Sequence, residues 1–127
     1  MVEHMRLTLD QPDDVLLISA CDASQIVIGD RVLTSSLVLA AQTLHTDWDV
    51  ARVSDVTLAS LTPALSLEPE ILLLGTGRQL VFPDHALFAN LLQKGIGLEV
   101  MDTTAACRTY NILVADQRPV VAALIID

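Results

Sequence analysis

Two short segments of this sequence consist only of aliphatic residues, Ile71 to Leu74 and Val120 to Ile126. A strand with one face in solvent alternates apolar and polar side chains, whereas a strand covered on both faces has no such alternation. The two segments are therefore predicted to be parallel strands within a sheet. Because helical patterns lie between them, we expect right-handed β-α-β crossovers and an α/β fold with helices flanking the sheet.

The first of these helices is predicted over His85 to Lys94. Asp84 can cap its first turn, and Gly95 followed by Ile96 is typical of a left-handed helix stop with its hydrophobic contact. Its apolar face is formed by Leu87, Phe88, Leu91 and Leu92.

A strand over Gly97 to Met101 is predicted next, followed by a second helix over Thr104 to Val114. Thr103 or Asp102 can cap this helix, and Pro119 ends the turn that leads to the last strand. The side chains expected to point inward are Ala106, Tyr110, Leu113 and Val114.

The first half of the chain has a different texture, with short apolar segments separated by Asp, Ser or Gly. We interpret Val15 to Ala41 as an antiparallel meander, in which Gly29 and Asp30 form a tight hairpin turn. Its strands are predicted at Val15 to Ala20, Gln25 to Ile28, Arg31 to Leu33 and Ser36 to Ala41. Gln42 to Val53 is predicted to be a loop, followed by a short helix over Asp55 to Leu61 that Ser54 caps and Pro63 ends.

Length and composition limit what the chain can do. Its 127 residues have room for one domain, residues 1–127, and with 3% aromatic residues the core must be built from Leu, Val, Ile and Ala. The net charge is −9 and Lys94 is the only lysine, so nucleic acid is excluded as a partner because phosphate binding needs clustered Lys and Arg. The apolar segments are far shorter than the roughly 18 residues of a membrane span, so no membrane insertion is expected.

The N-terminal residues and the cysteines indicate the cellular compartment of the protein. Met1 to Arg6 lacks the basic start and apolar run of a secretion signal, which favours a cytoplasmic protein. Cys21 and Cys107 are too few for a disulfide scaffold, so reduced thiols are expected, although a single bridge remains an open alternative.

A binding site is predicted where two strands end. The candidate residues are Gly75, Thr76, Gly77 and Arg78 after one strand and Thr103, Thr104, Arg108 and Asn111 after the next. Carboxyl ends of parallel strands share one edge, and a helix N-terminus beside Arg78 and Arg108 could hold a small anion such as a carboxylate or phosphate. The alternative is structural: the glycines permit a tight turn, Thr103 caps the helix, and Arg108 pairs with Glu70 or Glu99.

Other residues give weaker indications. Cys107 lies near the start of a helix whose dipole could lower its pKa and make it nucleophilic, but a small core residue is the favoured interpretation. His45, Asp47 and Asp49 lack the further ligands of a metal site, and we predict neither a metal nor a cofactor. Trp48 is expected in the core rather than on a partner surface.

Several motifs together resemble a known family. They are Leu72 to Arg78, the helix end Gly95-Ile96, Glu99 to Thr103, and Ala106 to Asn111. This pattern is similar to the Mth-type family of domains of unknown function, which includes mitochondrial complex I assembly factor three proteins; the likeness is strong from Pro69 to Ile126. The resemblance implies a three-layer fold in which the meander lies beside a central mixed sheet. It also implies a role in building a respiratory or membrane complex.

Two functions are consistent with these observations. The first is a non-catalytic assembly or interaction protein that binds a protein partner or a second copy of itself, favoured by the resemblance and by the lack of a recognisable acid–base or nucleophile set. The alternative is a small-anion-binding protein or an uncharacterised enzyme that uses the Gly75–Arg78 and Thr103–Arg108 loops.

Overall fold

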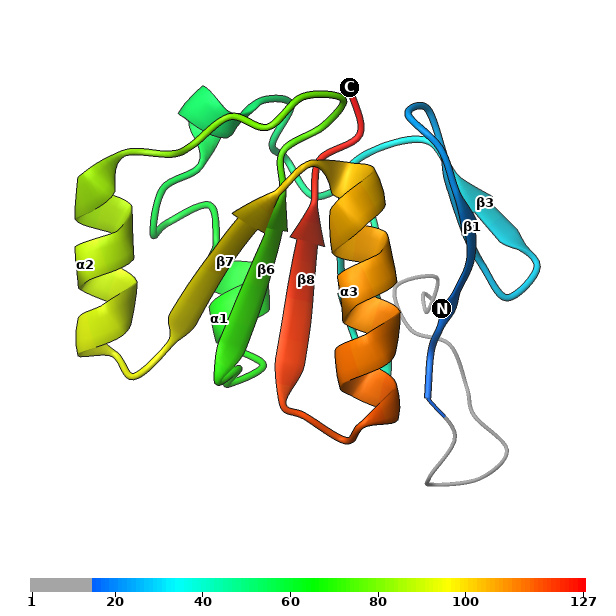
Figure 1. Ribbon diagram of the computed structural model, residues 1–127. Helices are drawn as coiled ribbons and strands as arrows, with labels where there is room; N and C mark the ends of the chain where they lie inside the picture. Colours follow the sequence, from blue (N-terminus) through cyan, green and yellow to red (C-terminus); the bar gives the residue numbers. More distant parts are fainter. Residues whose placement is uncertain (1–14) are drawn as a thin grey trace.

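A five-stranded mixed sheet forms the centre of the protein in the computed structural model, which describes residues 15–127 (Figure 1). The strand order is β5-β4-β8-β6-β7, with bounds β4 Leu37–Ala40, β5 Thr43–His45, β6 Ile71–Gly75, β7 Gly97–Met101 and β8 Val120–Leu124. β6 pairs in parallel with both β7 and β8, whereas β4 runs antiparallel to β8 and β5. The two aliphatic segments therefore form adjacent parallel strands, as the sequence predicts.

Two helices cover opposite faces of this sheet. α2 (His85–Gln93) connects β6 to β7, and α3 (Thr103–Ala115) connects β7 back past β6 to β8. Right-handed crossovers in opposite directions place their helices on opposite faces. Alternate residues of β6 confirm this, because Leu73 packs in one core cluster with α3 and Leu72 in the other with α2.

The ends of both helices follow from local chemistry. Asp84 caps α2 by accepting a hydrogen bond from the Ala86 amide at 3.1 Å, and Gly95 after it has a φ of +80°. Such a left-handed conformation costs glycine little, which explains the sharp stop. The apolar face of α2 is narrower than predicted: Leu87 and Leu91 are buried, but Leu92 is 72% exposed.

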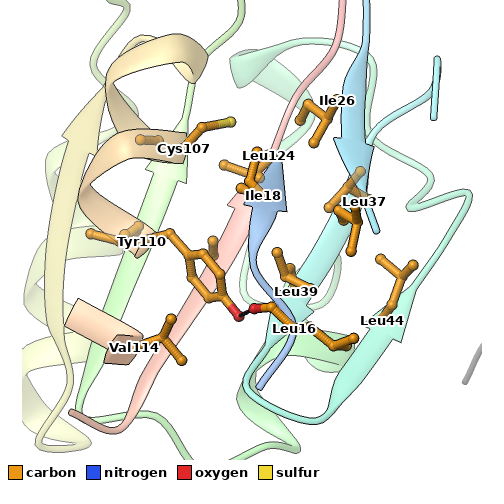
Figure 2. Close-up of a cluster of buried hydrophobic side chains, with 14 of the residues drawn as sticks. Leu16, Ile18, Ile26, Leu37, Leu39, Leu44, Cys107, Tyr110, Val114 and Leu124 are labelled. Atoms are coloured by element: carbon orange, nitrogen blue, oxygen red, sulfur yellow. Dashed lines mark hydrogen bonds between the residues drawn. The ribbon is translucent and has the colours of Figure 1, made fainter. Parts of the chain in front are cut away.

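A second, three-stranded antiparallel sheet lies beside α3 (Figure 1). It contains β1 (Ile18–Cys21), β2 (Ile26–Ile28) and β3 (Arg31–Leu33), in that order. Figure 2 shows the buried cluster that joins this layer to α3, in which the Tyr110 hydroxyl donates to the Leu16 carbonyl at 2.8 Å. The expected three-layer arrangement is thus confirmed.

The first half of the chain departs from the sequence prediction in two strands. The segment predicted as the last meander strand forms β4 of the central sheet instead, because three of its four residues are buried and it can be covered on both faces only there. Thr43–His45 forms β5 within the predicted loop. This strand has only three residues, too few to show a periodicity in the sequence.

The connection to β6 also differs from the prediction. In place of a helix over Asp55 to Leu61, the chain forms a short 3-10 turn at Val53–Asp55 and the helix α1 (Thr62–Leu65). Pro63 lies in the first turn of α1, where its missing N–H costs nothing, rather than ending a helix. Trp48 is buried as expected, and its indole N–H donates to the Ser60 carbonyl at 2.7 Å.

Two predictions concern membranes and the N-terminus. Among residues 15–127, no helix is long and apolar enough to cross a bilayer. The segment Met1 to Arg6, on which the cytoplasmic prediction depends, lies outside the described residues.

Candidate functional site

The two predicted turns do meet at one edge of the central sheet. The Thr76 amide donates to the Met101 carbonyl at 2.9 Å, and the Gly77 amide donates to the Thr103 hydroxyl at 2.8 Å. We call this cluster, formed by Gly75–Arg78, Asp102, Thr103 and Asp127, the rim. Its adjacency follows from the parallel pairing of β6 with β7, because both strands end at the same level.

Polar groups of the rim are bonded within the chain. Thr103 is 4% exposed, and besides accepting from Gly77 its hydroxyl donates to the Ile125 carbonyl at 2.6 Å. The Thr76 hydroxyl is also buried and donates to the Gln79 carbonyl at 2.6 Å. Packing leaves no room for a larger residue, because a Cβ atom at Gly75 would lie 2.9 Å from the Thr103 hydroxyl oxygen.

Carboxylates of the chain itself occupy the electropositive positions of the rim. Asp102 caps α3 by accepting a hydrogen bond from the Ala105 amide at 2.9 Å. Its carboxylate therefore occupies the helix N-terminus, the position that a bound anion would take. Asp127 accepts from the Arg78 amide at 3.1 Å and lies 3.9 Å from the Arg78 Nε. An external anion would have to displace both carboxylates. Of the two caps that the sequence allows, Asp102 is the one used.

Thr104, Arg108 and Asn111 line a separate pocket between α3 and β1. The pocket has a volume of about 310 Å³, and its remaining walls are Ile18, Ser19, Ala20, Cys21 and Cys107. Both polar ends of the Asn111 side chain are used: its carbonyl accepts from the Ile18 amide at 2.9 Å, and its amide donates to the Ile18 carbonyl at 2.8 Å. Arg108 is exposed, and within residues 15–127 its guanidinium forms no hydrogen bond or ion pair, either with Glu70 and Glu99 or with another residue.

The same pocket contains a thiol pair that the sequence prediction did not assemble. The Cys107 Sγ lies 3.0 Å from the Cys21 Sγ, although the residues are 86 positions apart, and both are free thiols. Burial raises the pKa of the Cys107 thiol, and its hydrogen bond with Cys21 raises it further. The favoured interpretation of Cys107 as a small core residue is confirmed by its burial, and desolvation opposes the alternative, a pKa lowered by the helix dipole.

An exposed apolar segment follows the rim after Gln79. Leu80, Val81 and Phe82 are 51%, 46% and 65% exposed. Sequence reasoning missed this segment, although three consecutive apolar residues between Gln79 and Pro83 were a visible signal. Single exposed apolar residues are ordinary, whereas three consecutive ones form a continuous apolar surface that a partner could cover. No group of three residues suited to a metal ion occurs among positions 15–127.

The layers and connections described above define a mixed α/β domain with an added antiparallel sheet. The chain belongs to the family described as "Protein of unknown function (DUF498/DUF598)", whose pattern matches residues 18–125. The resemblance inferred from the motifs is thereby confirmed.

Named relatives and solved structures agree with this assignment. The Xenopus tropicalis protein NADH dehydrogenase (ubiquinone) 1 alpha subcomplex assembly factor 3 is 34% identical over 122 residues, which are 94% of this chain and 66% of the frog protein. An NMR structure of a Xanthomonas campestris protein has a TM-score of 0.82 at 34% identity and covers 96% of this chain and 92% of its own. A Bordetella pertussis protein described as a Mth938-like domain has a TM-score of 0.76 at 30% identity, covering 97% and 93%.

Proposed function

We propose that this protein is a non-catalytic interaction module that assists the assembly of a multisubunit respiratory or membrane complex. The observation that carries the proposal is the exposed apolar segment Leu80–Phe82, which we assign as the docking segment. The assembly role of the frog relative, as its name states it, supports the kind of partner proposed. That partner is a complex subunit with an apolar recess.

Local bonding holds the docking segment in one shape with its side chains outward. The Thr76 hydroxyl accepts from the Val81 amide at 3.2 Å while donating to the Gln79 carbonyl, and Pro83 after the segment is buried. A preorganised segment loses little conformational entropy on binding. Because these residues are already about half covered, burial of the remaining surface would contribute about 1–2 kcal/mol for each side chain.

The excess of acidic residues in this protein indicates which residues surround the apolar recess on the partner. The chain carries 16 acidic and 7 basic residues, and the exposed Asp84 follows the docking segment after Pro83. Basic residues around an apolar recess would therefore be complementary to this surface and would speed association.

A complementation experiment tests the proposal. Cells that lack the protein would receive the wild-type chain, the Leu80→Ser/Phe82→Ser variant, or Ile112→Ser as the matched control, since Ile112 is 68% exposed on α3. We expect wild type and control to restore the amount of assembled NADH dehydrogenase complex on native gels, and the double variant to restore several-fold less. Equal rescue by all three chains, or an unchanged complex in cells without the protein, would contradict the proposal. Thermal melts of each variant verify that it is folded.

The second candidate function is binding of a small anion. It is supported by Arg108, an exposed guanidinium on the wall of the pocket with no partner within residues 15–127. Calorimetric titration with inorganic phosphate tests it, with Arg108→Ala as the variant and Arg118→Ala, which changes another exposed arginine, as the control. Binding lost only in Arg108→Ala supports this candidate, and no heat of binding to the wild type overturns it.

A further inference from the structure

We propose that Cys21 and Cys107 form a reversible dithiol–disulfide site, oxidised by a small anionic disulfide such as glutathione disulfide that enters the pocket between α3 and β1. The observation behind this proposal is the 3.0 Å separation of the two Sγ atoms, which come from the end of β1 and the second turn of α3. A disulfide bond needs about 2.05 Å between sulfurs, so the thiols have to approach by only about 1 Å. Figure 2 shows the Cys107 side chain on the side of α3 that faces the strands.

Exposure gives the two thiols different roles. Cys107 is 2% exposed, whereas Cys21 is half-buried, and both line the pocket of about 310 Å³. Thiol–disulfide exchange requires access of the attacking sulfur to the oxidant, so Cys21 reacts first and Cys107 second. The guanidinium of Arg108 on the same wall attracts the carboxylates of glutathione disulfide.

The proposed reaction has two exchange steps. The Cys21 thiol loses its proton to solvent, and its sulfur attacks one sulfur of glutathione disulfide, forming a mixed disulfide and releasing one glutathione, which takes up a proton. Cys107 then loses its proton and attacks the Cys21 sulfur, which breaks the mixed bond and releases the second glutathione. Two protein thiols are oxidised and one glutathione disulfide is reduced to two thiols, so atoms and electrons balance.

Oxidation would join the two layers of the molecule covalently. The bond would connect the three-stranded sheet to α3, across a separation of 86 residues in the chain. Closing so long a loop restricts the unfolded state, and we expect the melting temperature to rise by about 5 °C or more. The pocket contains none of the residues Leu80–Phe82, and the proposed oxidation does not depend on the docking proposal.

The test begins with the full-length wild-type chain treated with glutathione disulfide. We expect loss of both titratable thiols, a mass decrease equal to two hydrogen atoms, a Cys21–Cys107 peptide in a non-reducing digest, and reversal by dithiothreitol. Two thiols that remain titratable in the folded protein overturn the proposal, as does a disulfide-linked dimer in place of the internal bond. This measurement needs no variant, so it stands even where a substitution impairs folding.

Single variants test the order of the steps. Cys107→Ala should accumulate one glutathione on Cys21, whereas Cys21→Ser should leave Cys107 unmodified over the same time, because Cys107 is buried. Equal modification of the two variants contradicts the assigned roles. Arg108→Ala should slow oxidation by glutathione disulfide about threefold or more while leaving oxidation by the neutral 2-hydroxyethyl disulfide unchanged. Equal slowing with both reagents would show that Arg108 does not act by attracting the carboxylates of glutathione disulfide.

Discussion

The rim and the pocket both lie at the start of α3, yet they use their polar groups in opposite ways. At the rim, Thr103 is buried and bonded to Gly77 and Ile125, and Asp127 accompanies Arg78. In the pocket, Arg108 is exposed without a partner among residues 15–127, and two free thiols face each other. This difference shows that polar residues at a strand end indicate a binding site only when their side chains are not already bonded to other groups of the same chain. The rim has its polar groups bonded within the chain, whereas the pocket retains a guanidinium and two free thiols.

The largest effect is expected from Thr103→Val at the rim. This change removes both hydroxyl bonds and leaves the Gly77 amide and the Ile125 carbonyl buried without partners, so we expect a loss of about 2–4 kcal/mol in the free energy of unfolding. Urea denaturation measures it. The control Thr104→Val, on the pocket wall, should cost less than about 1 kcal/mol. Equal losses would remove the distinction between rim and pocket.

Asn111→Ala should have the next largest effect. Although Asn111 lines the pocket, its side chain bonds both backbone groups of Ile18, and we expect a loss of about 1–2 kcal/mol from their removal. The same denaturation experiment measures it, with Thr104→Ala as the neighbouring control. If Asn111→Ala cost no more than that control, water would be replacing the amide, and the pocket wall would be looser than described.

Alkaline pH should destabilise the protein through Cys107. Burial raises the pKa of this thiol, so above the unfolded value of about 8.5 the unfolded chain releases a proton that the folded chain retains. Stability is complete below that pH and should fall by up to about 1.4 kcal/mol per pH unit above it. Cys107→Ala should flatten the decline measured by urea denaturation between about pH 8.5 and 9.5, before tyrosine titrates. An unchanged slope would show that the thiol is better solvated than its burial indicates.

Arg78→Ala should have the smallest effect. Its ion pair with Asp127 is 3.9 Å long, and the two side chains are 58% and 43% exposed, so solvent screens it and the expected cost is below about 0.5 kcal/mol. Circular dichroism melts at low and high salt measure this difference. A drop of several degrees in melting temperature would instead make Arg78 a structural part of the rim.

The second half of the chain could be predicted because its signals are local. Asp84 and Gly95 delimit α2 by capping chemistry, and the aliphatic segment at Ile71 identifies a doubly covered strand. Strand ends then placed Thr76 and Thr103 together without knowledge of any side-chain contact. The helix and strand assignments require only residues a few positions apart, and the placement of Thr76 beside Thr103 adds only the rule that parallel strands end at one edge.

The remaining features depend on tertiary packing, which no local pattern specifies. Leu37–Ala40 carries the same apolar character in a meander or a central strand, and only its pairing with β8 decides between them. Likewise, the thiol pair and the Asp127 contact join segments 86 and 49 residues apart. Such contacts depend on how the three-stranded sheet and the C-terminus dock, which the periodicity of the sequence does not record.

The pairing of Asn111 with Ile18 has a consequence for self-association in the cell. β1 is a border strand of its sheet, and bare backbone groups at such a border can recruit strands from other molecules and start fibrous assemblies. Here Asn111 occupies the N–H and C=O of Ile18, and Tyr110 takes the Leu16 carbonyl. Two side chains of α3 thus occupy backbone groups of Leu16 and Ile18 with which a strand from another molecule would otherwise pair.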